Sequence, residues 1–230
     1  MQSLWDYYFP LYDLTSKDFF TCYPVMSYFS ALVYEADEKI EASQKGNSKN
    51  SSVECWLPLK NVAEDLFKHI GILTPEIEQE LNLATEYVHL EEKMVCEKKI
   101  NHADLRCAME IRSFDLRVLH RTFLLMLGRT IEKKILDAVY AFEVLVEIED
   151  DVDQYHEDVQ ENKFNTYRAL VNLYRTDAPL KLEQELEYYR KMFEQRLSQL
   201  PANSQGRIAR VYEGFRRDFP SPEIPEPILE

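Results

Sequence analysis

The chain has 230 residues, of which 45% are hydrophobic and 30% charged, a composition typical of a soluble globular protein with one domain or slightly more. Its net charge of −14 repels nucleic acid and anionic membrane surfaces, and this excludes the basic nucleic-acid-binding classes. Only 5 glycines are present, which favours helices over a sheet of short strands.

The cysteines and the N-terminus indicate the cellular compartment. Cys22, Cys55, Cys96 and Cys107 form no C-x-x-C pair, and the N-terminus lacks the basic region and apolar run of a secretory signal. We therefore expect a cytoplasmic protein without structural zinc. The longest apolar run, 123–128, is too short to span a bilayer, so no membrane span is expected.

The first quarter of the chain is rich in aromatic residues. Pro10 and Pro24 predict an irregular or short helical segment, followed by a helix over 27–40. The stretch "EASQKGNSKNSSVE", residues 41–54, is polar and built from small side chains. This composition predicts an exposed loop.

The next two helices have clear end signals. A helix over 59–70 is predicted to end at Gly71, which is a typical C-terminal cap. Thr74 as the N-terminal cap and Pro75 at the first helical position then predict a helix that runs to about Lys99.

The second half of the chain is also predicted to be helical. Asn101 or His102 caps a helix over 103–127 that ends at Gly128, and further helices are expected over 130–159, 178–197 and 204–215. The sequence thus predicts an all-α fold, a single helical bundle of about six to eight helices over 1–217. Residues 218–230 form a Pro-rich acidic tail that we expect to lie outside the fold.

The helix predicted over 130–159 has an unusual acidic face. Seven carboxylates lie between Glu147 and Asp158 without any Lys or Arg among them. At about 100° per residue, one side of the helix is apolar. The opposite side contains Glu143, Glu147, Asp150, Asp151, Gln154 and Asp158. An amphipathic helix with a solvated acidic face is one interpretation of this pattern.

A metal site is the second interpretation of the acidic face. Glu143 and Glu147 interrupt the apolar run 138–148, and an ionised carboxylate in a core costs several kcal/mol unless it is paired or bound to metal. Carboxylates and a side-chain amide suit Mg²⁺ when a phosphorylated ligand supplies the other oxygens. The predicted Mg²⁺ ligands are Glu147, Asp150, Asp151, Gln154 and Asp158.

Basic residues near this face complete a predicted diphosphate pocket. Arg112 falls within the apolar stripe of the helix over 103–127, where it needs a carboxylate or phosphate partner. An internal ion pair with Asp115 or Glu147 is the alternative to a ligand-binding role. Lys163 and Arg168 follow the acidic helix and add positive charge where it ends.

The stretch "IEDDVDQYHEDVQENKFNTY", residues 148–167, resembles the later metal-binding helix of the class I isoprenoid synthase superfamily. In the terpene cyclases of that superfamily the motif reads Asn/Asp-Asp-x-x-Ser/Thr-x-x-x-Glu. Asp150, Asp151, Gln154 and Asp158 have this spacing, with Gln in place of the hydroxyl residue and Asp in place of Glu. The resemblance covers about residues 100–200.

The resemblance implies an all-α bundle in which acid-rich motifs on facing helices hold Mg²⁺ around a prenyl diphosphate. It implies catalytic roles for Asp150, Asp151 and Arg112, which would ionise or transfer this substrate. The expected substrate-binding residues are Arg106, Arg112, Lys163, Tyr167 and Arg168. The first acidic motif of the superfamily would fall within 13–18 or 86–92.

Two other functions remain open on the sequence. A non-catalytic helical interaction protein would dock a basic partner on the acidic face. A di-iron carboxylate bundle is indicated by Asp153-x-x-His156 and Glu86-x-x-His89, because such bundles use this spacing on two helices. The sequence also leaves a homo-oligomer open.

Overall fold

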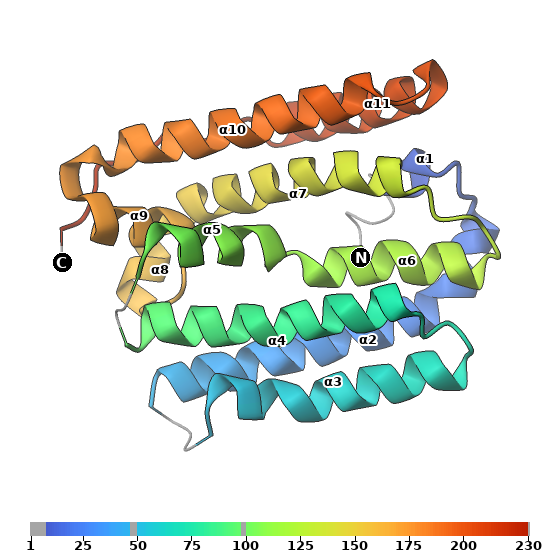
Figure 1. The fold of residues 1–230 in the computed structure, drawn as a ribbon, viewed down its shortest axis with the longest axis horizontal. Coiled ribbons are helices and arrows are strands. Elements are labelled where there is room, and N and C mark those ends of the chain that lie inside the picture. Colours follow the sequence, from blue (N-terminus) through green and yellow to red (C-terminus); the bar gives the residue numbers. More distant parts are fainter. Residues whose placement is uncertain (1–7, 47–49, 98–99, 230) are drawn as a thin grey trace.

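The computed structural model describes residues 8–46, 50–97 and 100–229, and all regular structure within these ranges is helical (Figure 1). The predicted all-α fold is therefore confirmed. The helices are α1 (Phe9–Leu11), α2 (Ser16–Gln44), α3 (Ser52–His69), α4 (Pro75–Val95), α5 (His102–Ile111), α6 (Phe114–Met126), α7 (Lys133–Asp153), α8 (Tyr155–Glu161), α9 (Thr166–Tyr174), α10 (Ala178–Ser198) and α11 (Ala202–Asp218).

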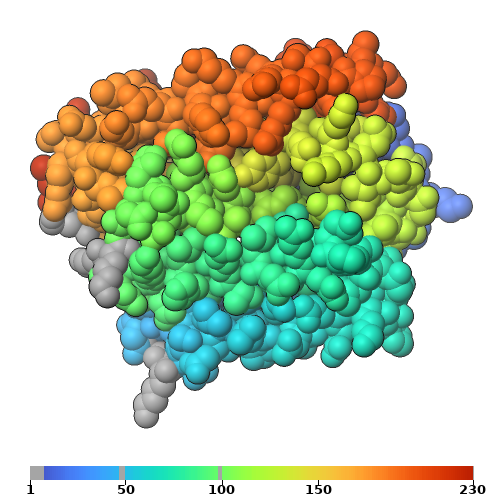
Figure 2. Space-filling view, in the orientation of Figure 1, coloured from blue at the N-terminus to red at the C-terminus, as the bar shows by residue number. Residues whose placement is uncertain are grey.

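The helices form a bundle with α10 and α11 on one side and α3 on the other (Figure 1). Helix α7 packs along α10, while α4 packs against both α3 and α6. Figure 2 shows the same order as bands of side chains, from α10 in orange to α3 and α4 in cyan and green. Among the described residues, no helix combines the length and the apolarity needed to cross a membrane.

The apolar core consists of three clusters of buried side chains. The first lies among α2, α3, α4 and α6, and the second among α4, α5 and the helices from α7 to α10. The third joins α1 to α7, α10 and α11. Tyr87 on α4 packs against both of the first two clusters. The candidate site described below lies beside Tyr87, where these two clusters meet.

Several predicted helix ends are confirmed. The Thr74 side chain accepts a hydrogen bond from the amide of Ile77 at 3.4 Å, and the Asn101 side chain caps α5 in the same way. Gly71 and Gly128 follow α3 and α6 with φ of +76° and +63°, a conformation that is strained for residues with a Cβ.

The predicted interruption at Pro24 is wrong. Helix α2 begins after the Thr15 cap and runs through Pro24, with Cys22 and Met26 buried on either side of it. A proline removes one helical hydrogen bond, and the burial of its neighbours against the first core cluster offsets that loss.

The loop predicted over 41–54 is shorter in the structure. Helix α2 continues to Gln44, and α3 begins at Ser52, where Ser51 and Glu54 form a capping box. The amide of Ser52 also donates to Oε1 of Glu92 at 3.2 Å, which ties the start of α3 to α4. Residues 47–49 of this range lie outside the described residues, as does Lys99, the predicted end of the next helix.

The single helix predicted over 103–127 is divided in two. Helix α5 ends at Ile111 and α6 begins at Phe114. The break leaves carbonyl groups without helical partners, and the guanidinium of Arg117 donates to two of them, those of Glu110 at 3.4 Å and Ile111 at 3.2 Å. Arg112 lies in this break, on the wall of the candidate site.

The helix predicted over 130–159 is also divided, at Gln154 between α7 and α8. Helix α8 ends at Glu161, and Asn162 is its C-terminal cap. Asn162 has a φ of +57°, a conformation that asparagine adopts more readily than most residues. The chain then turns into α9, which the sequence did not predict. The Asn165 side chain caps α9 by accepting a hydrogen bond from the amide of Arg168 at 3.0 Å.

The C-terminal segment, residues 219–229, lies against the bundle, contrary to the expectation for this tail. The hydroxyl of Tyr167 donates to the carbonyl of Pro225 at 2.7 Å, and the hydroxyl of Tyr155 accepts from the amide of Ile228 at 2.8 Å. Ile224 packs against the second core cluster. The tail joins the fold because the two buried tyrosines need hydrogen-bond partners.

Candidate functional site

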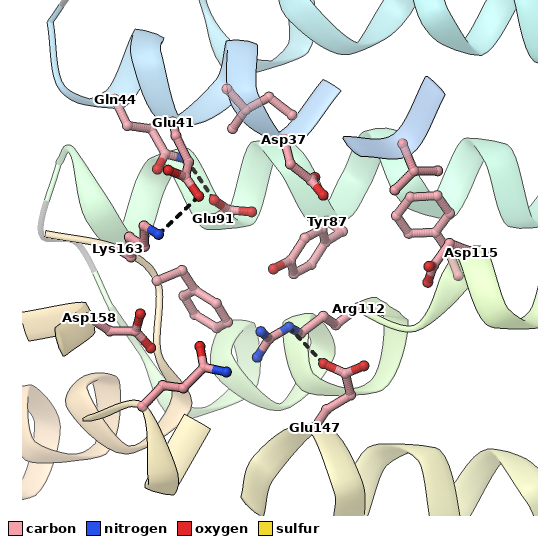
Figure 3. A pocket seen from close by; sticks show the side chains of 15 residues that line it. Asp37, Glu41, Gln44, Tyr87, Glu91, Arg112, Asp115, Glu147, Asp158 and Lys163 are labelled. Atoms are coloured by element: carbon pink, nitrogen blue, oxygen red, sulfur yellow. Dashed lines mark hydrogen bonds and ion pairs between the residues drawn. The ribbon is translucent and has the colours of Figure 1, made fainter. Parts of the chain in front are cut away.

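A polar cavity of about 310 Å³, here called the acidic cavity, lies between α2 and α4 on one side and α7 and α8 on the other (Figure 3). The break between α5 and α6 and the turn before α9 close it. Its lining residues are Val33, Asp37, Ile40, Glu41, Gln44, Tyr87, Glu91, Arg112, Phe114, Asp115, Glu147, Gln154, Asp158, Lys163 and Phe164.

The lining of the acidic cavity has an excess of negative charge. Among the described residues that line it, six have carboxylate side chains and only Arg112 and Lys163 are cationic. Both cations already have partners. The Lys163 ammonium lies 3.4 Å from Glu41 and 3.0 Å from Glu161, while Arg112 lies 3.1 Å from Glu147. Among the described residues, no cationic side chain forms an ion pair with Asp37, Glu91, Asp115 or Asp158.

Burial raises the pKa of several of the carboxyl groups that line the cavity. Burial raises the pKa of Glu147 to about 7, although the Arg112 guanidinium acts in the opposite direction. Burial also raises the pKa of Asp115 to about 6 and that of Asp37 to about 7. It raises the pKa of Glu91 and Asp158 as well. Near neutral pH the cavity thus holds protons that a bound cation would displace.

Arg112 makes the internal ion pair that was the alternative to a ligand-binding role. Its Nε lies 3.1 Å from Oε2 of Glu147, and its Nη1 donates to Oδ1 of Asp151 at 2.7 Å. The other predicted partner, Asp115, also lines the cavity (Figure 3) but forms no ion pair with Arg112 among the described residues. Arg112 thus fixes two carboxylates of α7 and borders the cavity.

The five predicted Mg²⁺ ligands separate into two groups. Glu147, Gln154 and Asp158 line the acidic cavity. Asp151 does not, because its two oxygens are taken by Arg112 and by the amide of Thr166 at 2.7 Å. Asp150 is exposed on the outer side of α7, where its Oδ2 accepts from Nε2 of Gln154 at 2.9 Å.

The predicted substrate-binding residues also separate. Lys163 and Arg112 line the acidic cavity, whereas the other three side chains have structural contacts elsewhere. Nη2 of Arg106 donates to both oxygens of Glu185, at 2.7 and 2.9 Å. Arg168 donates to the carbonyl of Lys163 and to the side chain of Asn162. The hydroxyl of Tyr167, as described above, holds the C-terminal segment.

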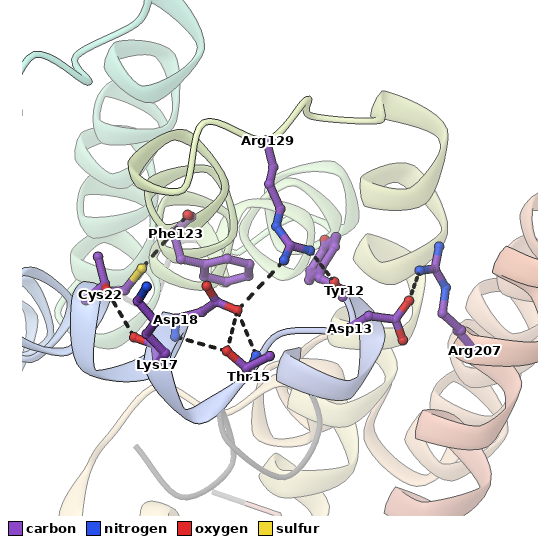
Figure 4. A network of polar contacts seen from close by, with 10 residues as sticks. Tyr12, Asp13, Thr15, Lys17, Asp18, Cys22, Phe123, Arg129 and Arg207 are labelled. Atoms are coloured by element: carbon purple, nitrogen blue, oxygen red, sulfur yellow. Dashed lines mark hydrogen bonds and ion pairs between the residues drawn. The ribbon is translucent and has the colours of Figure 1, made fainter.

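Residues 13–18, one of the two ranges for a first acidic motif, are not among the described residues that line the acidic cavity, and Figure 4 shows their contacts. Asp18 belongs to the capping box of α2 with Thr15, and it lies 3.8 Å from Arg129. Asp13 pairs with Arg207 at 2.6 Å. The second range, 86–92, contributes Glu91 to the cavity, where Nε2 of Gln44 donates to it at 2.8 Å.

Sequence reasoning missed the contribution of α2. Asp37 and Glu41 are four residues apart and therefore share one face of this helix, which is turned to the cavity. Their spacing could have been read from the sequence. The polar composition of 41–54 predicts a loop instead, which separates Glu41 from the helix that carries Asp37.

The structure does not favour the di-iron hypothesis. Asp153 and His156 are exposed on the outside of α7 and α8, and Glu86 and His89 are exposed on α4. Over residues 8–46, 50–97 and 100–229, no three His, Cys, Asp or Glu side chains lie close enough together to hold a metal ion by themselves.

A second cavity, here called the apolar cavity, adjoins the first. Its volume is about 340 Å³, and it shares Val33, Asp37, Asp115 and Glu147 with the acidic cavity. The other residues that line it are Tyr8, Ser30, Tyr34, Leu116, Leu119, Phe142, Glu143, Val146 and Phe215. Together the two cavities form one path that is acidic at one end and mainly apolar and aromatic at the other.

Comparison with protein-family models, with curated proteins and with solved structures gave no match for the chain. The residues of the two cavities are therefore the basis on which a function is proposed.

Proposed function

We propose that this protein binds a prenyl diphosphate in a Mg²⁺-dependent manner, with the diphosphate in the acidic cavity and the hydrocarbon tail in the apolar cavity, and that it ionises or transfers this substrate. The observation that supports the proposal is the shared wall of the two cavities, in which Glu147 and Asp115 border both. A ligand that is anionic at one end and apolar at the other matches this path.

The donor set of the acidic cavity fits Mg²⁺. Its oxygens come from carboxylates such as Glu91 and Asp158 and from the amides of Gln44 and Gln154, and none of its lining residues is a thiol or an imidazole. Mg²⁺ is usually held by one or two carboxylates together with phosphate oxygens and water. When bound, the ion would act as a Lewis acid on the leaving diphosphate.

The excess negative charge makes the role of the metal testable. A diphosphate that enters the acidic cavity alone meets six carboxylates and two cations, so it should be repelled. Mg²⁺ reverses the sign of that interaction. The proposal thus requires that the diphosphate bind tightly only with the metal, and that the metal bind tightly only with the diphosphate.

Thermal and urea unfolding of the full chain test this proposal. Farnesyl diphosphate and Mg²⁺ together should stabilise the protein by about 2.7 kcal/mol at a ligand concentration of about 100 times Kd. Either compound alone should have little effect. Mg²⁺ with inorganic diphosphate separates the contribution of the head group from that of the tail. No stabilisation at millimolar Mg²⁺ with farnesyl diphosphate would rule the proposal out.

The docking of a basic protein is the second candidate function. Asp150, Asp153 and Glu157 are exposed along the outer side of α7 and α8, and they would attract a basic surface by electrostatic steering. Burial favours the first proposal, however, because Glu143 is 2% exposed and a cavity lies beside Glu147. Association that depends on these exposed residues and falls steeply with salt would support the docking function.

A further inference from the structure

Glu143 on α7 is a buried carboxylate that the proposed binding of Mg²⁺ and diphosphate does not use. Its side chain is 2% exposed and lies one helical turn before Glu147. It borders the apolar cavity and also a third cavity of about 350 Å³ between α4, α6, α7 and α10. A buried carboxyl group at such a position needs a physical reason.

Among the described residues, both hydrogen-bond partners of Glu143 contact the same carboxylate oxygen. Nε2 of His120 lies 3.0 Å from Oε1 of Glu143, and the hydroxyl of Tyr8 donates to the same Oε1 at 3.3 Å. Within the part of the chain that the structure describes, no residue donates a hydrogen bond to Oε2. The carboxylate is thus held by one oxygen while the second can accept a proton.

The hydrogen bonds around His120 determine how it is protonated. The hydroxyl of Tyr12 lies 3.1 Å from Nδ1 of His120. Burial and the nearby Glu143 carboxylate raise the pKa of Tyr12, so this hydroxyl keeps its proton and can donate a hydrogen bond to Nδ1 when Nε2 of the ring carries the proton. The ring proton then resides on Nε2 and is directed at Glu143, an assignment that follows from the network.

Two further contacts hold this network in place. Nη1 of Arg129 donates to the backbone carbonyl of Tyr12 at 2.7 Å, which fixes the segment before α2 (Figure 4). The Tyr8 ring packs edge-on against the His120 ring with their centres 4.4 Å apart. The Glu143 carboxylate is thus held by His120, which is itself held by Tyr12, and a carboxylate fixed in this way can act as a general base.

We infer that Glu143 is the general base of the site, and that its Oε2 removes a proton from the hydrocarbon part of the ligand in the apolar cavity. This inference rests on the proposed function. When the C–O bond to the diphosphate breaks, its electron pair leaves with the diphosphate and an allylic cation remains. A neighbouring C–H bond then breaks, its proton joins Oε2 of Glu143, and its electron pair forms a new double bond.

The reaction balances without a further reactant. An allylic diphosphate gives a polyene and diphosphate, and the proton on Glu143 returns to solvent in the next cycle. The competing fate of the cation is capture by water, which gives an alcohol. The ratio of polyene to alcohol therefore reports on the base, independently of how fast the diphosphate leaves.

The experiment compares Glu143→Gln with Glu149→Gln in the full chain. Glu149 is also a buried glutamate of α7, but its partner is Arg216 and it borders neither cavity, so it serves as the matched control. Each variant is incubated with farnesyl diphosphate and Mg²⁺, and polyene, alcohol and released diphosphate are measured. Glu143→Gln should lower the ratio of polyene to alcohol by about 10²-fold, whereas Glu149→Gln should leave it unchanged.

Two further measurements separate the possible failures. Thermal stabilisation by Mg²⁺ with an unreactive thiolo analogue of farnesyl diphosphate should be the same for Glu143→Gln and the wild type. If the wild type shows no such stabilisation, the proposed function fails and this inference fails with it. If binding persists and the product ratio of Glu143→Gln equals that of the wild type, the inference alone is wrong.

Tyr8→Phe keeps the test informative if Glu143→Gln does not fold. This substitution preserves the ring contact with His120 and removes only the hydroxyl that donates to Oε1 of Glu143. The less firmly held carboxylate should still deprotonate the cation, with a product ratio between those of the wild type and a chain without the base. An unchanged ratio in a folded Tyr8→Phe protein would overturn the inference.

Discussion

Nη1 of Arg112 donates to Oδ1 of Asp151 at 2.7 Å, and the Asp151 side chain is 2% exposed. The other oxygen of Asp151 accepts from the amide of Thr166. One carboxylate thus connects the break between α5 and α6, the C-terminal part of α7 and the start of α9. This connection fixes the wall of the acidic cavity.

Arg112→Met should strongly destabilise the fold. It removes the charge that compensates a buried carboxylate, and breaking such a pair costs about 3–5 kcal/mol. Urea unfolding measures the change. Arg190→Met is the control, because Arg190 and Glu187 form an exposed pair on α10 and its loss should cost less than about 1 kcal/mol. Equal losses in the two variants would contradict the role assigned to Arg112.

Stability should fall as the pH rises from about 4 to about 7. The pKa of Glu147 is raised to about 7 and that of Asp115 to about 6, while both carboxyl groups titrate near pH 4 in an unfolded chain. The folded protein therefore binds more protons in this window, and the free energy of unfolding decreases with pH. Carboxyl groups with a lowered pKa, such as that of Asp18, change the free energy of unfolding at pH values below this window.

Urea unfolding at about pH 5 and about pH 7.5 measures this dependence. Glu147→Gln removes one of the groups that bind the extra protons, so the difference in the free energy of unfolding between the two pH values should become smaller. Glu187→Gln on the exposed side of α10 should leave the difference unchanged. A protein that is more stable at the higher pH would show that these groups ionise freely in the folded state.

Binding of Mg²⁺ with farnesyl diphosphate should tighten between about pH 6 and pH 8. The metal binds deprotonated carboxylates, and those of Asp37 and Glu147 are largely protonated below pH 7 because burial raises the pKa of each to about 7. Binding should therefore release protons. Calorimetry in two buffers with different ionisation enthalpies measures the release, and identical heats in both buffers would contradict this prediction.

Lys163→Met should change ligand affinity, whereas Arg106→Met should change stability. Lys163 borders the acidic cavity and is partly exposed, so its loss should weaken Mg²⁺-dependent diphosphate binding about tenfold with little change in stability. Arg106 pairs with the buried Glu185, so its loss should lower stability and leave the affinity unchanged. Both affinities follow from calorimetric titration, and a weaker Arg106→Met complex would restore the ligand-binding role expected for Arg106.

Tyr167→Phe should lower stability by about 1 kcal/mol, because it removes the hydrogen bond to the carbonyl of Pro225. A chain that ends at Asp218 lacks this acceptor. In that shorter chain the same substitution should have a smaller effect, and the coupling is measured by urea unfolding of the four proteins. Additive effects would mean that the C-terminal segment does not depend on Tyr167.

The sequence predicts the fold class well, because helix caps are local signals. The Thr74 cap with Pro75 and the glycine at 71 depend only on neighbouring residues, and all three lie where they were expected. The breaks inside the predicted long helices are not local. The break after Ile111 is stabilised by Arg117, whose Nε donates at 2.7 Å to Oε2 of Glu80, a residue of α4 that is far away in the sequence.

The site was only partly predictable for a similar reason. Periodicity placed Glu147 and Asp158 on one face of the acidic helix, and both line the acidic cavity. It could not show that the Asp151 carboxylate accepts hydrogen bonds from Arg112 and from the amide of Thr166. These two partners lie in the break before α6 and at the start of α9, and helical periodicity does not reveal contacts between separate elements. The contribution of Asp37 comes from α2, far away in the sequence.

The C-terminal segment has a practical consequence for handling the protein. The carbonyl of Pro225 is hydrogen-bonded to Tyr167, and the amide of Ile228 is hydrogen-bonded to Tyr155. Tyr155 is the first residue of α8, the helix that brings Asp158 to the acidic cavity. An affinity tag or fluorophore attached downstream would be tethered to the same helix. Such a label could perturb the very binding event it is meant to report, whereas a label in the turn between α10 and α11 would avoid this contact.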